Sequence, residues 1–198
     1  MAEPEVISLY DRHAGAFAAA RRQDLFERPW LDAFRTRLPG PNVLDLGCGT
    51  GVPMAAYLID AGCRVTGVDG APAIIARASA RFSEHTWHTA DLRALPPLPP
   101  ADGLLLWHSL FHLTDPAQRT LFAQLASLAK PGAPLLFTTG HTAGESYGTL
   151  EGQPLYHASL APGTYRNLLR DAGFTLCDHR SEDPTCGGAT VWLAQRDP

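Results

Sequence analysis

The sequence predicts an α/β protein built on a seven-stranded, mostly parallel sheet with helices on both faces. Short apolar runs alternate with helical stretches over residues 42–139, which is the pattern of repeated strand–helix–strand units. The first apolar run leads into a glycine-rich turn, Gly-Cys-Gly-Thr-Gly at residues 47–51. Two apolar runs near the end of the chain are joined by a short turn, which requires an antiparallel pair.

Composition narrows the class of protein. The 198 residues suffice for one domain with a substantial core, and we expect residues 1–40 to form a helical cap and residues 41–198 the sheet core. The formal net charge is -4 with no basic run, which gives a nucleic-acid partner no electrostatic support. No signal peptide and no apolar run of the ~20 residues of a membrane helix is evident. The four cysteines lack CxxC and zinc-ligand spacing, so we expect a reduced, cytoplasmic protein.

Two helices are expected before the first strand. Residues 1–20 are rich in alanine, and Tyr10 and Phe17 fall on one helical face. A second helix is expected over residues 24–38, with Pro29 early and the Pro-Gly-Pro of residues 39–41 as its end. Because both precede the first strand, we expect them to cap one end of the sheet.

The alternating region is divided by glycine and proline. Glycine or Pro-Gly follows several helices, and proline stands near the start of several others. The expected strands are 42–46, 64–68, 85–89, 103–107 and 133–139, and the expected helices are 53–61, 71–82 and 116–129. An irregular loop is then expected over 140–161, followed by a helix at 162–172 and strands at 174–180 and 190–195.

The glycine spacing separates the first turn from two common nucleotide-binding motifs. A nicotinamide-binding turn reads G-x-G-x-x-G with the pyrophosphate at a helix N-terminus, and a P-loop needs a GK[ST] that this chain lacks. Glycine has no Cβ, so the turn can take positive φ and let a ligand lie directly on the backbone. A turn that binds nothing is the alternative.

Two aspartates end the second and third expected strands. A carboxylate at Asp69 can accept hydrogen bonds from both hydroxyls of a ribose. Asp91 could accept from an adenine amino group, with Leu92 and Ala71 packing on the ring. The carboxyl ends of neighbouring parallel strands are where open α/β sheets bind ligands. Plain turn and capping roles are the alternatives.

On these residues the chain resembles the class I S-adenosylmethionine-dependent methyltransferases, particularly compact bacterial enzymes acting on small molecules. The matching stretches are residues 10–12, 43–51, 65–69, 90–92 and 125–136. The resemblance implies a Rossmann-like sheet of seven strands whose last strand is inserted antiparallel. It also implies S-adenosyl-L-methionine (SAM) as cofactor and S-adenosyl-L-homocysteine as product.

The resemblance also implies roles for individual residues. The glycine turn faces the methionine part of SAM, Asp69 binds the ribose, and Asp91 with Leu92 contacts the adenine. Tyr10 is expected to help close the site, and a plain core aromatic is its alternative. The full set of expected cofactor contacts is Tyr10, Asp45, Gly47, Cys48, Gly49, Asp69, Gly70, Ala71, Asp91, Leu92 and Trp107.

Three histidines are candidate general bases. His108 and His112 follow the fourth expected strand, His141 follows the fifth, and we expect all three to reach the rim of the site. Each could instead be a hydrogen-bonded loop residue. A base is needed only if the acceptor carries a proton that must leave. The spacing of His108 and His112 could suit a metal, but no HExxH and no third ligand is evident, so no metal is predicted.

The stretch 141–159 is expected to border the acceptor pocket, because long loops in compact domains are commonly functional. Glu145, Tyr156 and His157 are its candidate substrate-binding residues. A surface excursion with Tyr156 packed as core is the alternative.

We therefore expect a SAM-dependent methyltransferase that transfers a methyl group by SN2 displacement to a small-molecule acceptor. The alternatives are an NAD(P)-dependent oxidoreductase, which the glycine spacing disfavours, and a non-catalytic SAM-binding protein. We expect no nucleic-acid or membrane partner, and a monomer or homodimer. The acceptor and its atom (oxygen, nitrogen, sulfur or carbon) do not follow from the sequence.

Overall fold

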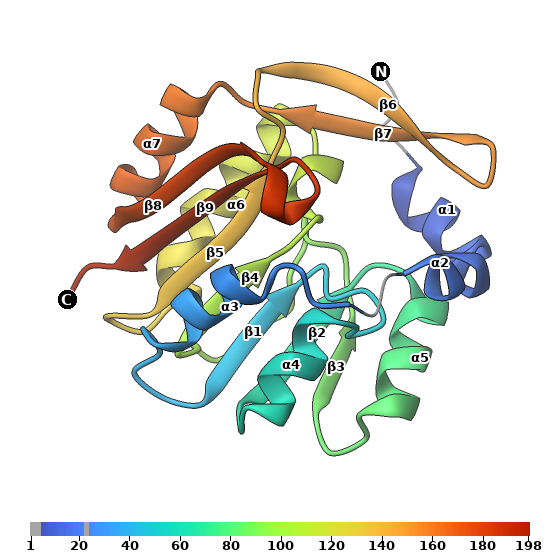
Figure 1. Ribbon diagram of the computed structural model, residues 1–198, viewed down its shortest axis with the longest axis horizontal. Helices are drawn as coiled ribbons and strands as arrows, with labels where there is room; N and C mark the ends of the chain where they lie inside the picture. The colour runs from blue at the N-terminus through green and yellow to red at the C-terminus, as the bar shows by residue number, and fades with distance from the viewer. Residues whose placement is uncertain (1–4, 22–23) are drawn as a thin grey trace.

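The computed structural model describes residues 5–21 and 24–198 and is organised around a seven-stranded sheet (Figure 1). The strand order is β3-β2-β1-β4-β5-β9-β8. The parallel strands are β1 (Asn42–Leu46), β2 (Arg64–Asp69), β3 (Thr86–Thr89), β4 (Gly103–Leu106) and β5 (Pro134–Thr139). β9 (Ala189–Arg196) lies antiparallel between β5 and β8 (Phe174–Asp183). The predicted sheet and its antiparallel last strand are confirmed.

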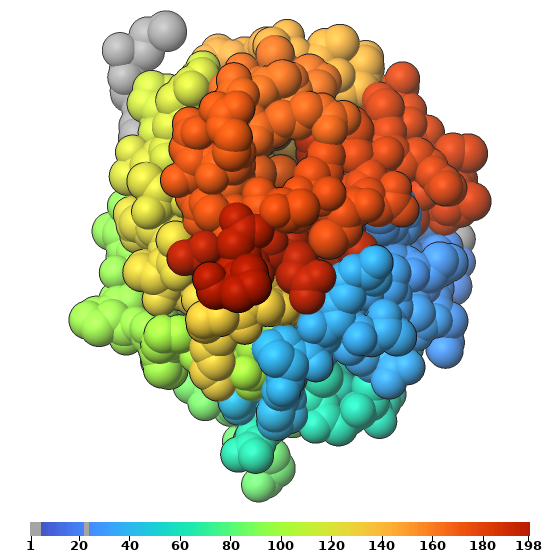
Figure 2. Space-filling view, turned by 90° about the vertical axis from the view of Figure 1, so that its left-hand side faces the viewer, coloured from blue at the N-terminus to red at the C-terminus, as the bar shows by residue number. Residues whose placement is uncertain are grey.

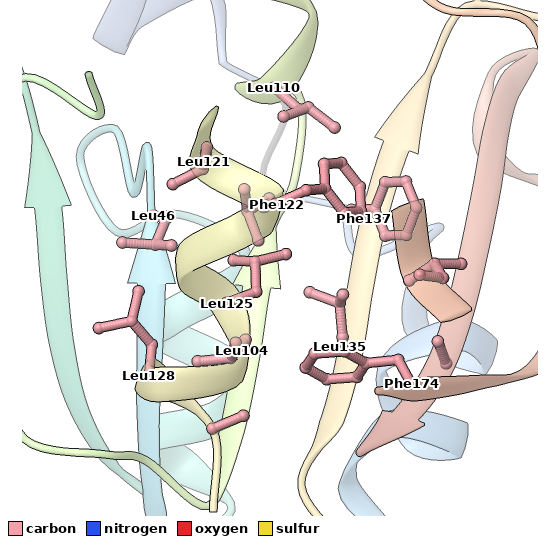
Figure 3. Close-up of a cluster of buried hydrophobic side chains, with 14 of the residues drawn as sticks. Leu46, Leu104, Leu110, Leu121, Phe122, Leu125, Leu128, Leu135, Phe137 and Phe174 are labelled. Atoms are coloured by element: carbon pink, nitrogen blue, oxygen red, sulfur yellow. The ribbon is translucent and has the colours of Figure 1, made fainter. Parts of the chain in front are cut away.

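Two helical layers explain why the central strands are apolar throughout. Every residue of β4 and β5 is buried, as expected for parallel strands covered on both faces. On one face, α6 (Asp115–Leu128) and α7 (Pro162–Asp171) pack on the sheet, and the leucine and phenylalanine side chains between α6 and the strands form a continuous core (Figure 3). On the other face, α3 (Arg28–Arg35) and α4 (Met54–Asp60) cover the alternate side chains.

The edge strand β8 forms much of one side of the molecule together with α7. In the space-filling view of this side, α7 and the β8–β9 pair lie next to one another and meet the region of α3 (Figure 2). The short helices η1 (Leu110–His112) and η2 (Pro184–Cys186) follow β4 and β8, and α5 (Pro72–Arg81) follows β2.

The N-terminal region differs from the prediction of one helix over residues 1–20. Residues 1–4 lie outside the described residues, and the rest forms α1 (Val6–Arg12) and α2 (Ala14–Ala20), which are separated at His13 (φ -109°, ψ 19°). Asp11 Oδ1 accepts a hydrogen bond from Ala73 N at 2.7 Å, in the first turn of α5, which anchors α1 beside the sheet. The second predicted helix does not cap the site. It shortens to α3, whose Trp30, Leu31 and Phe34 pack on the sheet face.

The irregular loop predicted for residues 140–161 is wrong. β6 (Gly144–Leu150) and β7 (Gln153–Ser159) form a separate antiparallel hairpin, joined by Glu151 and Gly152. Both turn residues have positive φ (49° and 74°), which matches the twist of a two-residue hairpin. The sequence did not indicate this turn because its first residue is glutamate, whereas two-residue hairpin turns are usually recognised by Asn-Gly or Asp-Gly. The hairpin crosses above the sheet and ends beside α1 (Figure 1).

Within the described part of the chain, we find no helix with the length and apolar character needed to cross a bilayer.

Candidate functional site

A cavity of about 310 Å³ lies at the carboxyl ends of β1, β2 and β4. The glycine turn after β1, helices α1 and α2, the segment after β4, and one residue of the hairpin line it. This is the edge at which open α/β sheets bind ligands. Of the predicted site residues, the lining includes Tyr10, Asp45, Gly47, Cys48, Gly49, Asp69, Gly70, Asp91, Leu92, Trp107, His108, His112 and His157.

The structure places four predicted site residues outside this cavity. Ala71 is buried and does not line the cavity, and its backbone N–H donates to Asp69 Oδ1. His141 is exposed, and its Nδ1 lies 3.7 Å from Glu182 Oε1. The expectation that His141 reaches the site is therefore corrected.

Glu145 and Tyr156 miss the cavity because of hairpin geometry. Successive side chains of a strand point to opposite faces, so Tyr156 and His157 cannot share one. His157 lines the cavity, whereas Tyr156 is buried and its hydroxyl donates to Glu145 Oε1 at 2.9 Å. Tyr156 therefore packs as core, which was the alternative reading of this stretch.

The floor of the cavity is backbone held by neighbouring strands. Gly47 N and Cys48 N both donate to Val68 O, at 2.7 and 3.0 Å, which ties the turn to β2. Gly47 has φ 80°, and a Cβ at this position would lie 2.1 Å from Ser109 Cβ. Ser109 Oγ in turn donates to Leu46 O at 2.6 Å. The segment after β4 therefore packs directly on the turn, and only glycine fits at residue 47.

Asp69 links the glycine turn to the end of β2. Its Oδ2 accepts from Gly49 N and its Oδ1 from Ala71 N, both at 3.0 Å. Burial raises the pKa of this carboxyl, and the two backbone N–H groups oppose the shift. Each carboxylate oxygen can accept more than one hydrogen bond, so Asp69 keeps acceptor capacity for a ligand.

A second carboxyl, Asp45, lies in β1 at the same end of the cavity. Burial and the nearby charge of Asp69 raise its pKa to about 7, while the charge of Arg21 opposes the rise. Arg21 also lines the cavity, and its Nε donates to Val52 O at 3.2 Å. The two carboxyl groups therefore favour binding of a positively charged group at this end of the cavity.

Asp91 follows β3, the neighbour of β2 in the sheet, and already has a partner. Arg93 Nε lies 2.9 and 2.8 Å from its two carboxylate oxygens. Leu92 beside it is buried and lines the cavity. An apolar surface next to a carboxylate suits a flat base with an amino group.

His112 has both ring nitrogens engaged. Its Nδ1 lies 3.0 Å from Tyr156 O, and its Nε2 lies 3.1 Å from Tyr10 Oη. A carbonyl only accepts, so Nδ1 carries the proton in the neutral ring and Tyr10 donates to Nε2. Burial, chiefly, lowers the pKa of His112 to about 4, and burial also raises that of Tyr10 to about 12. The contact therefore joins two uncharged groups.

His108 is held by its backbone. Its φ of 53° lies in the left-handed region, which is uncommon outside glycine and often found at functional sites. Its backbone N donates to Thr138 Oγ1 at 2.9 Å. Burial, followed by the charge of Arg21, lowers the pKa of the imidazole to about 3.

Several lining residues were missed by sequence reasoning. Ile7 and Phe17 come from α1 and α2, and Ser109 and Phe111 come from the segment after β4. The seven-residue spacing of Tyr10 and Phe17 was the available signal, since both rings meet edge to face at 5.2 Å. Among the described residues, no cluster of three or more His, Cys, Asp or Glu side chains is placed to hold a metal ion.

Known proteins resemble this chain in sequence and in fold. The sequence profile of a family described as "Methyltransferase domain" matches residues 43–132. The chain is 33% identical over 136 residues to a malonyl-[acyl-carrier protein] O-methyltransferase of Serratia marcescens, covering 68% of this chain and 52% of that protein. It is 26% identical over 166 residues to a ubiquinone biosynthesis O-methyltransferase of Acinetobacter baumannii, covering 74% and 69%. The chain thus spans about half the length of the first of these relatives.

A solved structure shares the fold over the whole chain. It is a 1,6-didemethyltoxoflavin-N1-methyltransferase of Burkholderia thailandensis, with a TM-score of 0.73 and 22% identity, covering 100% of this chain and 92% of that one. That structure contains S-adenosylhomocysteine. At this level of identity the likeness establishes the fold.

Proposed function

We propose that the chain is a class I S-adenosylmethionine-dependent methyltransferase and that it transfers the methyl group of SAM to a small-molecule acceptor, as its similarity to methyltransferases in sequence and fold supports. The observation that carries the proposal is the hydrogen bond from Gly49 N to Asp69 Oδ2 at the cavity floor. It places a carboxylate with spare acceptor capacity beside bare backbone, at the carboxyl ends of two neighbouring strands.

The residues that line the cavity fit SAM. Gly47 and Gly49 would lie under the methionine part, where side chains would intrude. Asp69 would accept from the ribose hydroxyls, and Asp91 with Leu92 would contact the adenine. Asp45 would face the positive charge of the methionine part, together with the remaining predicted contacts Tyr10, Cys48, Gly70 and Trp107.

SAM supplies a methyl group on a sulfonium, whose leaving group is already activated. The protein's task is then to hold the acceptor in line with that methyl group, which can lower the barrier by up to ~7–11 kcal/mol. Helices α1 and α2 and the hairpin would exclude water. Arg12 Nη2 lies 3.3 Å from Gln153 Oε1 and His13 Nε2 lies 3.0 Å from Gln153 Nε2, and these contacts tie the two covers together.

A base would add about 10²–10⁴-fold if the acceptor must lose a proton. His108 and His112 are the candidates that line the cavity. The relatives' names include both O- and N-methyltransferases, so the names support transfer to a heteroatom without choosing between oxygen and nitrogen.

We further propose that the reaction takes place in the cytoplasm. All four cysteines are free, as expected in a reducing cytoplasm. The acceptor is a small molecule rather than a nucleic acid or membrane surface, and the enzyme acts as a monomer or homodimer.

Binding measurements test the proposal against its two alternatives. Calorimetry should show binding of SAM and S-adenosylhomocysteine and none of NADH. The variant Asp69→Ala should weaken SAM binding about ten- to a hundredfold through loss of charged hydrogen bonds. Asp171→Asn, an exposed carboxyl paired with Arg170, is the matched control and should bind normally. Binding of NADH alone would favour an oxidoreductase. SAM binding with no methyl transfer to a broad acceptor panel would favour a non-catalytic binding protein.

A further inference from the structure

The end of the cavity beyond the glycine turn is walled by rings. The Phe111 ring centroid lies 4.8 Å from that of His112, 5.1 Å from His157 and 5.8 Å from His108. His108 also lies 5.3 Å from Trp107. These side chains come from the segment after β4 and from β7, and all line the cavity. A continuous aromatic wall favours a flat partner, because ring pairs attract at centroid separations of about 4.5–7 Å.

This aromatic wall carries no full charge. The charged residues among the described lining are Arg21, Asp45, Asp69, Asp91 and Arg93, and none belongs to the wall. Arg93 is engaged with Asp91. Arg21 reaches the backbone of the glycine turn, offsets the charge of Asp45 and also contributes to the lowered pKa of His108. Among the described lining residues, a carboxylate or phosphate on the acceptor would find only Arg21 and Arg93 as cations, and it would compete with Asp45 and Asp91 for them.

The wall's histidines are neutral and offer lone pairs. Burial is the leading cause that lowers the pKa of His108, His112 and His157 alike. Both nitrogens of His112 are engaged, by Tyr156 O and Tyr10 Oη. Within the described chain no hydrogen bond reaches His108 Nε2, while His108 Nδ1 lies 3.4 Å from Thr138 Oγ1. When the proton of the neutral ring is on Nδ1, which can donate to Thr138 Oγ1, His108 Nε2 carries the lone pair and can accept a proton.

We propose that the acceptor is an uncharged planar aromatic ring carrying a hydroxyl or ring N–H at the methylation site, and that His108 Nε2 accepts the proton of that group. The inference rests on the proposed function. His112 is then a positioning residue, which holds Tyr10 of the cover against the wall. In the transfer, the electron pair of the oxygen or nitrogen forms the new bond to the methyl carbon. The C–S bond breaks with its pair on sulfur, the proton passes to His108, and the imidazolium later releases it to solvent.

A weakly basic imidazole suffices for this step. A hydroxyl oxygen that is gaining a methyl group develops positive charge, so its proton becomes strongly acidic as the bond forms. Transfer to His108 is then favourable late in the step even though burial disfavours the imidazolium. A more acidic hydroxyl, whose proton is lost more readily to water, should need the base much less.

Acceptor binding tests the ring class separately from turnover. The protein saturated with S-adenosylhomocysteine is titrated with 4-methylcatechol, thymine, 4-methylbenzoate and 4-methylcyclohexanol in a calorimeter. The first two carry the hydroxyl and the ring N–H, and at least one should bind about tenfold or more tightly than the charged acid and the non-planar alcohol. Binding of 4-methylcatechol would identify a hydroxyl as the donor group of the acceptor, and binding of thymine would identify a ring N–H.

Binding of 4-methylbenzoate or 4-methylcyclohexanol as tightly as both ring donors would overturn the acceptor class, and so would failure of both ring donors to bind. In these cases binding of SAM itself would leave the proposed function standing. Failure of SAM to bind would remove the proposed function instead.

A variant tests His108. His108→Gln should lower turnover of 4-methylcatechol by about 10²–10⁴-fold. It should lower turnover of the more acidic 4-nitrocatechol far less when both are measured at a mildly acidic pH, where this acceptor is also uncharged, and affinity for SAM should not change. His141→Gln, a matched change outside the cavity, should leave both rates unchanged. Equal losses on the two catechols, or no loss on either, would contradict the assignment of His108.

Discussion

The buried carboxyl of Asp45 should make the stability of the ligand-free protein depend on pH with an unusual sign. Burial and the charge of Asp69 raise its pKa from the ordinary 3.8 to about 7. The folded state therefore holds a proton that the unfolded chain has already lost. Stability from this source is complete below the unfolded pKa and is lost as the pH rises through the folded pKa.

The size of the effect follows from the shift. Between the two pKa values the slope is about 1.4 kcal/mol per pH unit, and it falls to half of that at the folded pKa, so a rise from pH 5 to pH 7 costs the folded state about 2 kcal/mol. Asp45 and Asp69 titrate as a pair, and the slope belongs to the pair. Asp45→Asn keeps the shape of the side chain and removes one of the two titrating groups. The free energy of unfolding of the variant, relative to wild type, should therefore rise by about 2 kcal/mol over the same interval.

Urea denaturation at pH 5, 6, 7 and 8 measures this difference. Asp102→Asn is the control, because contacts with Lys130 and Asn42 lower the pKa of Asp102 although burial opposes them, so its contribution is constant above pH 5. Parallel pH curves for wild type and Asp45→Asn would refute the reasoning. A cationic ligand favours the ionised pair, so SAM binding near pH 6 should release protons, which calorimetry in buffers of different ionisation enthalpy detects.

Three further predictions concern the cover and the glycine turn. Tyr10→Phe leaves the buried Nε2 of His112 without a donor and should lower the free energy of unfolding by about 1–3 kcal/mol in urea melts, whereas no change would show that this contact is absent in solution. Gly47→Ala should cost about 2–4 kcal/mol by the same measurement, because of its positive φ and the overlap with Ser109; Gly47→Ala combined with Ser109→Gly should recover part of the loss, and no recovery would count against the overlap. Gln153→Ala should speed amide hydrogen exchange in the hairpin while changing global stability by less than about 1 kcal/mol, and unchanged exchange would contradict its role in joining the two covers.

The contacts of helices α1 and α2 and of the β6–β7 hairpin, which cover the cavity, could not be predicted from the sequence. The sequence predicts Tyr10 as a closing residue, but its partner His112 lies 102 residues away, and no local pattern joins them. The hairpin was missed because Glu151-Gly152 is a weak turn signal and because its strands carry few β-branched residues. Among its candidates, Tyr156 and His157 are neighbours in sequence, and only the register of the hairpin decides which of them enters the cavity.

By itself, the sequence determined the sheet, its antiparallel last strand and the expected cofactor end of the cavity. These depend on local properties: apolar runs of strand length, glycines that permit positive φ at residues 47–51, and Asp69 at the end of its strand. Only the tertiary structure brought together the residues of the proposed acceptor end. Burial makes His108 and His112 neutral, a single hydrogen-bonding partner fixes the tautomer of His112, and the same packing excludes His141. Burial and orientation arise from contacts between distant segments, so the acceptor end could be read only once those segments had been brought together.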